Sequence, residues 1–237
     1  MQELLKPIRT ESLKDLFIRR FEELILSGAF QVGQKLPSER ELALQLSVSR
    51  PVVHEGLVDL AGKGLVTMIP RVGTIVNDYR KEGSLSLLTS LVNYHQGDLK
   101  PELLKSLLEM RLLFEVETVK LAALHRTGDQ LKSFRLLLQE ENAIDHHDTD
   151  GLCTLDFEFH HLTALASGNH IYPLLLNSFK NCYLNLAGRF FSDAAVVPEV
   201  FAFHEAMVNA IEEKDEKTAA RIMKDLLEHG AEHLQKS

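Results

Sequence analysis

Apolar residues recur at helical spacing in three segments near the start of the chain, over residues 12–26, 38–46 and 49–64. Ser38 and Glu41 have the spacing of a capping box, in which each satisfies a backbone amide of the first helical turn. Ser49 is a second candidate N-cap, followed by Pro51 in the first turn. The pattern therefore predicts three short helices separated by tight turns.

Two β-branched runs follow these helices. They are LVTMI at 65–69 and TIVND at 74–78, and the segment PRVG separates them with a proline and a glycine. Short β-branched runs joined by such a turn are typical of a β-hairpin. Three helices and a hairpin together predict a winged helix-turn-helix.

Beyond a polar joint at 77–84, the apolar spacing is helical throughout. About seven helices are predicted, over residues 84–96, 101–126, 129–147, 150–166, 170–190, 197–213 and 215–235. Short loops between long helices predict an antiparallel all-α bundle. We therefore expect a mainly α protein with two domains: a winged helix-turn-helix DNA-binding domain at 1–78 and an all-α helical domain at 79–237.

The amino-acid composition and the cysteines indicate the cellular compartment. Hydrophobic residues make up 45% of the chain and charged residues 25%, as in an ordinary soluble protein. Cys153 and Cys182 lie in apolar helical stretches without CxxC spacing, so reduced core thiols are expected rather than a disulfide. No segment has the apolar length of a membrane span. We expect a cytoplasmic protein without membrane association.

Net charge is divided unevenly between the two predicted domains. Residues 1–78 hold 10 Lys+Arg and 10 Asp+Glu, whereas residues 79–237 hold 16 and 24, so the whole net charge of -8 belongs to the second part. A neutral domain still presents a cationic face when its carboxylates point elsewhere, and DNA responds to that local potential.

Cationic and polar residues gather where a helix-turn-helix meets DNA. The first turns of the third helix face base edges in the major groove, and the wing lies near the minor groove or the backbone. Arginine donates two hydrogen bonds to guanine or to phosphate. The candidate DNA contacts are Lys35, Ser38, Arg40, Ser49, Arg50, His54, Arg71 and Gly73.

The same stretch resembles the N-terminal domain of the GntR family of bacterial transcription regulators. The motifs are GxFxxGxxLPSERELA at 28–43, VSR at 48–50 and GTxV at 73–76. This resemblance implies a homodimer that binds double-stranded DNA at a palindromic operator and responds to a small-molecule metabolite. Two positions depart from the family pattern: His54 stands where arginine is common, and Arg71 stands where glycine is usual.

The helical part resembles the effector-binding domain of the FadR subfamily, with EMRxxxE at 109–115, LDxxxH at 155–160 and ASGNxIY at 166–172. Asp156 and His160 are four residues apart, hence on one helix face, and His204 is placed to join them from a later helix. Neutral imidazoles with one carboxylate suit a divalent metal such as Zn, Ni or Mn. The fourth ligand of metal-binding relatives falls on Leu226, which leaves His229, one turn further, as a substitute only if the helix is shifted.

Several alternatives stay open at this site. The same three residues could form a hydrogen-bonded polar cluster without metal. His146, His147, His161 and His233 are predicted to lie at the surface. Arg111, one turn before Glu115, is either half of a buried ion pair or a cation aimed at an anionic effector.

The effector is predicted to be a small carboxylate that completes a metal's coordination, or an acyl-CoA or fatty acid held without metal. The candidate effector contacts are Arg111 and, as the resemblance to the fatty-acid-responsive members of the FadR subfamily implies, Tyr172, Asn177 and Arg189.

Two other classes of protein compete with a regulator. A metal-dependent hydrolase would use Glu158 as base, but Glu158 is two residues from His160 and therefore points to another helix face. A protein-interaction module would bind a partner through the winged domain instead of DNA. We expect the chain not to be an enzyme.

Overall fold

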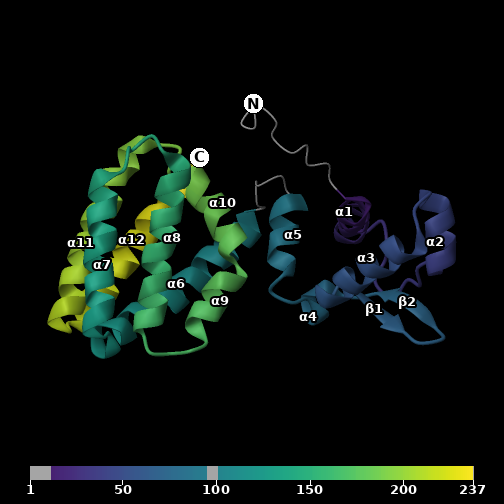
Figure 1. Ribbon diagram of the computed structural model, residues 1–237, viewed down its shortest axis with the longest axis horizontal. Helices are drawn as coiled ribbons and strands as arrows, with labels where there is room; N and C mark the ends of the chain where they lie inside the picture. The colour runs from purple at the N-terminus through teal and green to yellow at the C-terminus, as the bar shows by residue number, and fades with distance from the viewer. Residues whose placement is uncertain (1–11, 95–100, 237) are drawn as a thin grey trace, which may run out of the picture. The chain divides into compact units, whose positions relative to one another are not determined.

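The chain forms two compact units, residues 1–96 and 97–237. The computed structural model describes residues 12–94 and 101–236. The first unit contains α1 (Leu13–Leu26), α2 (Glu39–Leu46), α3 (Arg50–Gly62), β1 (Val66–Ile69), β2 (Gly73–Val76), α4 (Tyr79–Glu82) and α5 (Leu87–Tyr94) (Figure 1). The second contains α6 (Pro101–His125), α7 (Gly128–Ala143), α8 (Thr149–Ala166), α9 (Tyr172–Ser178), α10 (Lys180–Phe190), the 3-10 turn η2 (Ala194–Val196), α11 (Val197–Glu213) and α12 (Glu216–Lys236).

The first unit is the expected winged helix-turn-helix. α1 packs across α3, and the apolar stripe of α3 is completely buried at Val53, Leu57 and Leu60. The capping box predicted at the start of α2 is present: Ser38 Oγ accepts from the Glu41 amide, and the Glu41 carboxylate accepts from the Ser38 amide. The two strands pair antiparallel, from Val66 opposite Val76 to Ile69 opposite Gly73. The fold thus fixes the exposed side of α3 next to the wing.

A buried polar cluster attaches α5 to this unit. The Glu22 carboxylate on α1 accepts from Lys63 Nζ at 2.5 Å and from Ser90 Oγ at 2.7 Å, and Leu87 of α5 is part of the hydrophobic core. We call these three polar residues, Glu22, Lys63 and Ser90, the α5 latch. The compact unit therefore continues beyond the wing, and the functional division after residue 78 stays a prediction.

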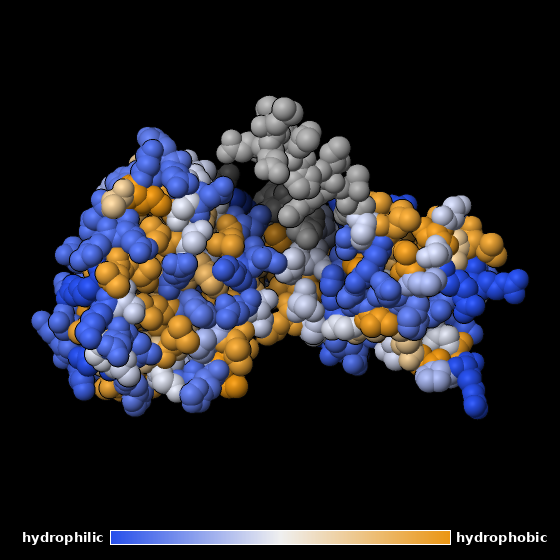
Figure 2. All heavy atoms as spheres, viewed as in Figure 1, coloured by the Kyte–Doolittle hydropathy of each residue, from blue (hydrophilic) through white to orange (hydrophobic). Residues whose placement is uncertain are grey.

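The second unit is an all-α bundle. α6 packs against α12 and α8, and α11 packs against α12 and α7. Figure 1 shows α7, α8, α11 and α12 running side by side. Cys153 and Cys182 are free and buried, as expected, and burial raises the pKa of each thiol to about 11. Hydrophilic and apolar residues alternate over the visible face of this unit (Figure 2).

Two predicted helices in this unit are wrong in their bounds. The segment 170–190 is not one helix but two, α9 and α10, divided at Phe179, and neither glycine nor proline marks that break. The helix predicted to reach 147 ends at Ala143, because Asp145 accepts from the His147 amide and Asp148 caps α8. Such side-chain hydrogen bonds compete with the helical backbone pattern.

One helical stretch among the described residues, 194–213, is long and apolar enough to cross a membrane by length and composition alone. This is weak evidence for a span, because core helices pass the same test. In the structure α11 buries Met207, Val208 and Ile211 against the other helices of the bundle.

Candidate functional site

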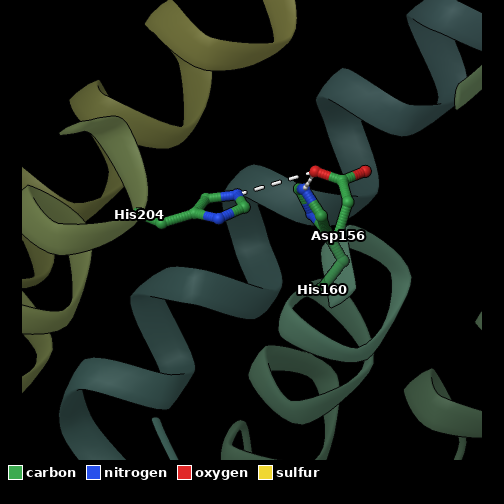
Figure 3. Close-up of side chains that lie close together, drawn as sticks. All are labelled: Asp156, His160 and His204. Atoms are coloured by element: carbon green, nitrogen blue, oxygen red, sulfur yellow. Dashed lines mark ion pairs between the residues drawn. The ribbon is translucent and has the colours of Figure 1, made fainter. Parts of the chain in front are cut away.

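Three potential metal ligands meet inside the helical bundle (Figure 3). Asp156 and His160 lie one turn apart on α8, and His204 faces them from α11. The Nε2 atoms of His160 and His204 lie 3.9 Å and 3.7 Å from the same oxygen, Asp156 Oδ1. One donor atom from each residue lies within 4.8 Å of the others. The sequence prediction that these three residues share a site is therefore consistent with the geometry.

A second carboxylate stands behind each imidazole. Glu115 on α6 contacts His160 Nδ1, and Glu141 Oε1 on α7 lies 2.6 Å from His204 Nδ1. Both carboxylates are buried. A histidine that binds metal through one ring nitrogen usually donates its other N–H to such a carboxylate, which fixes the tautomer and raises the basicity of the ligand atom. The arrangement leaves both Nε2 atoms directed at the space beside Asp156.

The sequence analysis did not predict Glu141 as part of this site, although its position on α7 indicates a buried carboxylate. Glu141 follows Phe134 and Leu138 at helical spacing on the buried stripe of α7. A glutamate on a core-facing stripe needs a partner, because an unpaired buried charge is costly. That partner is His204, 63 residues further along the chain.

The three residues fit a divalent cation. His204 Nε2 is buried and has no hydrogen-bond partner among the described residues, while the ring itself stacks on Phe159 at 3.8 Å. An orphaned imidazole nitrogen in a 0% exposed side chain is explained by a ligand that accepts its lone pair. Two imidazoles and one carboxylate are the donor set of borderline metals such as Zn, Ni and Mn.

Arg111 forms a largely buried ion pair with Glu115, in which the two side chains are 16% and 2% exposed. Arg111 Nε donates to Glu115 Oε1 at 2.5 Å, and the guanidinium lies 4.4 Å from the centre of the Tyr183 ring. Burial alone would raise the pKa of Glu115, but the charge of Arg111 and the hydrogen bonds from His160 and Arg111 outweigh it and lower that pKa to about 2. Of the two roles open for Arg111, the structure therefore contains the ion pair.

Tyr183 links this pair to the potential metal ligands. Its hydroxyl donates to Asp156 Oδ2 at 2.5 Å, which leaves Oδ1 to face the two histidines. Burial and the neighbouring Asp156 charge raise the pKa of Tyr183 well above its ordinary value, so the phenol stays protonated and remains a donor.

A cavity of about 40 Å³ opens beside these groups. Arg111, Asp156 and His160 form its polar side, and most of its remaining wall is apolar, including Leu186, Phe190 and Leu226. Leu226 therefore occupies the side of α12 that faces the site. His229 lies outside the ligand cluster, with Nδ1 3.8 Å from Glu199, so α12 is not shifted to bring it in.

The other predicted effector contacts lie away from this cavity wall. Tyr172 packs edge-on against Phe114, Asn177 is exposed on α9, and Arg189 is half-buried on α10. His146 and His147 are exposed as predicted, but the surface prediction is wrong for His233, which is half-buried against Phe190, and for His161, which is half-buried with a buried Nε2. Its stacking on Phe157 explains the difference.

The predicted DNA contacts of α3 share one exposed face. Arg50 and His54 lie one turn apart, opposite the buried stripe of that helix. Arg50 Nη2 lies 3.9 Å from Glu39 Oε2, but the Arg50 side chain is 67% exposed, so this surface pair is weak. His54 Nδ1 makes a closer contact, 2.8 Å to Glu39 Oε1. Ser49 makes no side-chain capping bond, which leaves its hydroxyl unused by the helix.

The remaining predicted contacts surround this face. Arg40 and Lys35 are exposed, and Ser38 belongs to the capping box of α2. Arg71 is exposed at the wing turn with φ 64°, a left-handed conformation that glycine adopts most easily. Gly73 has a backbone reason for its identity, because its φ of 126° is a conformation that residues with a side chain rarely adopt.

Two family models match the chain. The FCD domain model matches residues 106–229, and the model described as bacterial regulatory proteins, gntR family, matches residues 17–76. The chain is 30% identical over 231 residues to the HTH-type transcriptional regulator Mce2R of Mycobacterium tuberculosis, a match that covers 94% of this chain and 92% of that protein. It is 28% identical over 193 residues to the fatty acid metabolism regulator protein of Proteus mirabilis, covering 81% and 78%.

Solved structures of regulators have a similar fold. Streptococcus agalactiae GntR is similar with a TM-score of 0.50 and 28% identity, over 93% of this chain and 100% of that chain. The E. coli McbR/YncC structure has a TM-score of 0.56 over 96% and 99%, and at 16% identity it supports the fold alone. The chain therefore belongs to the GntR family of bacterial regulatory proteins, with an FCD domain after its winged helix-turn-helix, and is a DNA-binding transcription regulator rather than an enzyme.

Proposed function

We propose that this regulator binds a palindromic operator as a cytoplasmic homodimer and represses a metabolic operon until an effector enters the helical unit. Two copies of α3 would read two half-sites about one helical turn apart. The exposed face of Arg50, His54 and Ser49, with Arg40, Lys35 and Arg71 around it, supports this role. The net charge of -8 carried by residues 79–237 keeps the helical unit from binding DNA nonspecifically.

The effector site of this proposal is the cavity beside Asp156, His160 and His204. These three side chains would hold one divalent metal, which when bound supplies a Lewis-acidic position for an anionic ligand. The observation that carries the proposal is the convergence of two Nε2 atoms on Asp156 Oδ1, with both Nδ1 atoms already engaged by buried carboxylates. A small carboxylate is the effector that such a centre favours.

The wall of the cavity favours a second candidate. Leu186, Phe190, Leu226 and Leu234 are apolar, and the similar protein of Proteus mirabilis is named a fatty acid metabolism regulator. A fatty acid or acyl-CoA bound without metal would use this apolar side. Enlargement of the 40 Å³ cavity would be required for either effector.

Coupling between the two sites follows from differential affinity. An effector shifts the equilibrium between DNA-binding and released arrangements only if it binds one of them more tightly, by typically about 1 to 3 kcal/mol. Tyr183, Arg111 and Glu115 connect the metal ligands to α6 and α10, so occupation of the site acts on those helices.

Two measurements test the proposal. Gel shifts with duplexes selected by the protein, repeated from low to high salt, should show a steep fall of affinity with salt, because phosphate contacts release counterions. Native mass spectrometry and elemental analysis of the purified protein should show one divalent metal per chain, lost in His204→Ala. A metal-free protein carrying an acyl chain would support the second candidate, and selection of no duplex would contradict the proposal.

A further inference from the structure

A single carboxylate lies between the two exposed groups on the face of α3. Glu39 is the first residue of α2, and its Oε1 lies 2.8 Å from His54 Nδ1 while its Oε2 lies 3.9 Å from Arg50 Nη2. The imidazole is still 55% exposed and the Glu39 carboxylate 29% exposed. His54 is therefore held from one side and open on the other.

This contact decides which ring atom faces outward. An ionised carboxylate only accepts hydrogen bonds, so the His54 nitrogen that meets it, Nδ1, carries the proton. In a neutral imidazole the other nitrogen, Nε2, is then an acceptor. Glu39 thus presents the neutral ring of His54 with its lone pair directed away from α2.

Acceptors and donors are not interchangeable in the major groove. Adenine N6 and cytosine N4 offer amino hydrogens there, whereas guanine O6 and thymine O4 are acceptors that a lone pair repels. An arginine would make the opposite choice, because it has donors only. Arg50, one turn earlier on the same face, therefore selects different base edges from His54.

We propose that His54 is a specificity-determining residue that selects an amino-bearing base, adenine or cytosine, at one position of each half-site, and that Glu39 is the residue that positions it. This inference rests on the proposed binding of an operator by α3. A contact of His54 with phosphate would instead raise affinity for every sequence alike.

The experiment is selection from a pool of random duplexes at pH 8.0, where an unperturbed imidazole is neutral. The full-length protein is compared with His54→Ala, Glu39→Ala, Glu39→Gln and Glu55→Gln. The last is a matched control, because Glu55 is an exposed carboxylate on the same helix that makes no hydrogen bond to His54 among the described residues. Thermal melting of each variant by circular dichroism verifies folding.

The wild type should enrich adenine or cytosine at one position per half-site. His54→Ala should erase that preference alone and weaken binding to the selected duplex about fivefold per half-site, the value of one hydrogen bond. Glu39→Ala should weaken the same preference, because the ring is no longer held. Glu39→Gln should retain it, since the amide oxygen still accepts from Nδ1, and Glu55→Gln should leave it unchanged.

Three results would overturn the inference while the operator-binding proposal stands: a uniform loss of affinity in His54→Ala, a keto base at the sensitive position, or an unchanged preference in Glu39→Ala. If the wild type enriches no motif at all, the proposed operator binding itself fails.

Discussion

The buried cluster of the helical unit and the exposed face of α3 in the winged unit use charge in opposite ways. In the helical unit, Glu115, His160 and His204 are buried, the Arg111 side chain is only 16% exposed, and each is held by a close partner. In the winged unit, Arg50 and His54 are more than half exposed and share one carboxylate. Buried charges must be paired to be tolerated, whereas exposed charges cost little and remain available to a polyanion. The difference predicts that mutations in the first group change stability and those in the second change DNA affinity.

The largest expected effect is on DNA binding. Arg50→Ala removes a donor from both half-sites, and at about 1 to 3 kcal/mol per base contact the dimer should lose about 2 to 6 kcal/mol of operator affinity. Folding and dimerisation should be unaffected, because the side chain is exposed. Gel shift and size-exclusion chromatography measure these properties.

Arg20→Ala is the matched control for that substitution, since Arg20 is an exposed arginine on α1 whose pair with Glu23 is local. An unchanged gel shift in Arg50→Ala would contradict the placement of α3 in the groove.

The second effect tests the buried side of the comparison. Arg111→Met removes the guanidinium and leaves the Glu115 carboxylate buried without its main cationic partner, so the free energy of unfolding should fall by about 3 to 5 kcal/mol. Urea denaturation gives this value. Lys105→Met, at an exposed pair on the same helix, should change it by no more than about 0.5 kcal/mol. Equal losses in both variants would mean that burial does not distinguish the two pairs.

A smaller effect is expected for Glu141, which lies behind the proposed metal ligand His204. Glu141→Gln keeps an acceptor for His204 Nδ1 but removes the charge, so zinc affinity should fall about 10- to 100-fold. Competition with a chromogenic chelator measures it. Glu140→Gln, an exposed neighbour on α7, should bind zinc as the wild type does. Identical zinc affinity in both variants would remove Glu141 from the site.

The smallest effect concerns the scaffold of the winged unit. Ser38→Ala breaks the capping box at the start of α2 and should lower the free energy of unfolding by about 1 kcal/mol, whereas Ser38→Gly should cost only a few tenths. Thermal denaturation followed by circular dichroism compares the two. A loss as large in the glycine variant would show that the hydroxyl bond is not the source of the stability.

Local patterns predicted the winged unit well. Three features of this unit were predicted: the capping box of Ser38 and Glu41, the hairpin, and the helical spacing of α1 and α3. Each involves residues close in sequence, where periodicity and turn chemistry decide the structure. The division at Phe179 could not be predicted in this way, because the break carries no glycine or proline.

The site in the bundle could be predicted only in part. Helical spacing put Asp156 and His160 on one face, but the partners Glu115 and Glu141 reach the histidines through packing of α6 and α7. Periodicity predicts which face of a helix is buried, but it does not predict which other helix packs against that face. The same limit applies to α12, where the rotation of the helix directs Leu226 at the cavity and His229 toward Glu199.

The α5 latch has a practical consequence for dissecting the protein. A fragment that stops after residue 78 would keep the buried Glu22 carboxylate and Lys63 but lose the Ser90 hydroxyl, which donates to Glu22, and the Leu87 side chain, which belongs to the hydrophobic core of this unit. An isolated DNA-binding unit intended for crystallisation or spectroscopy should therefore extend through Tyr94, the last residue of α5.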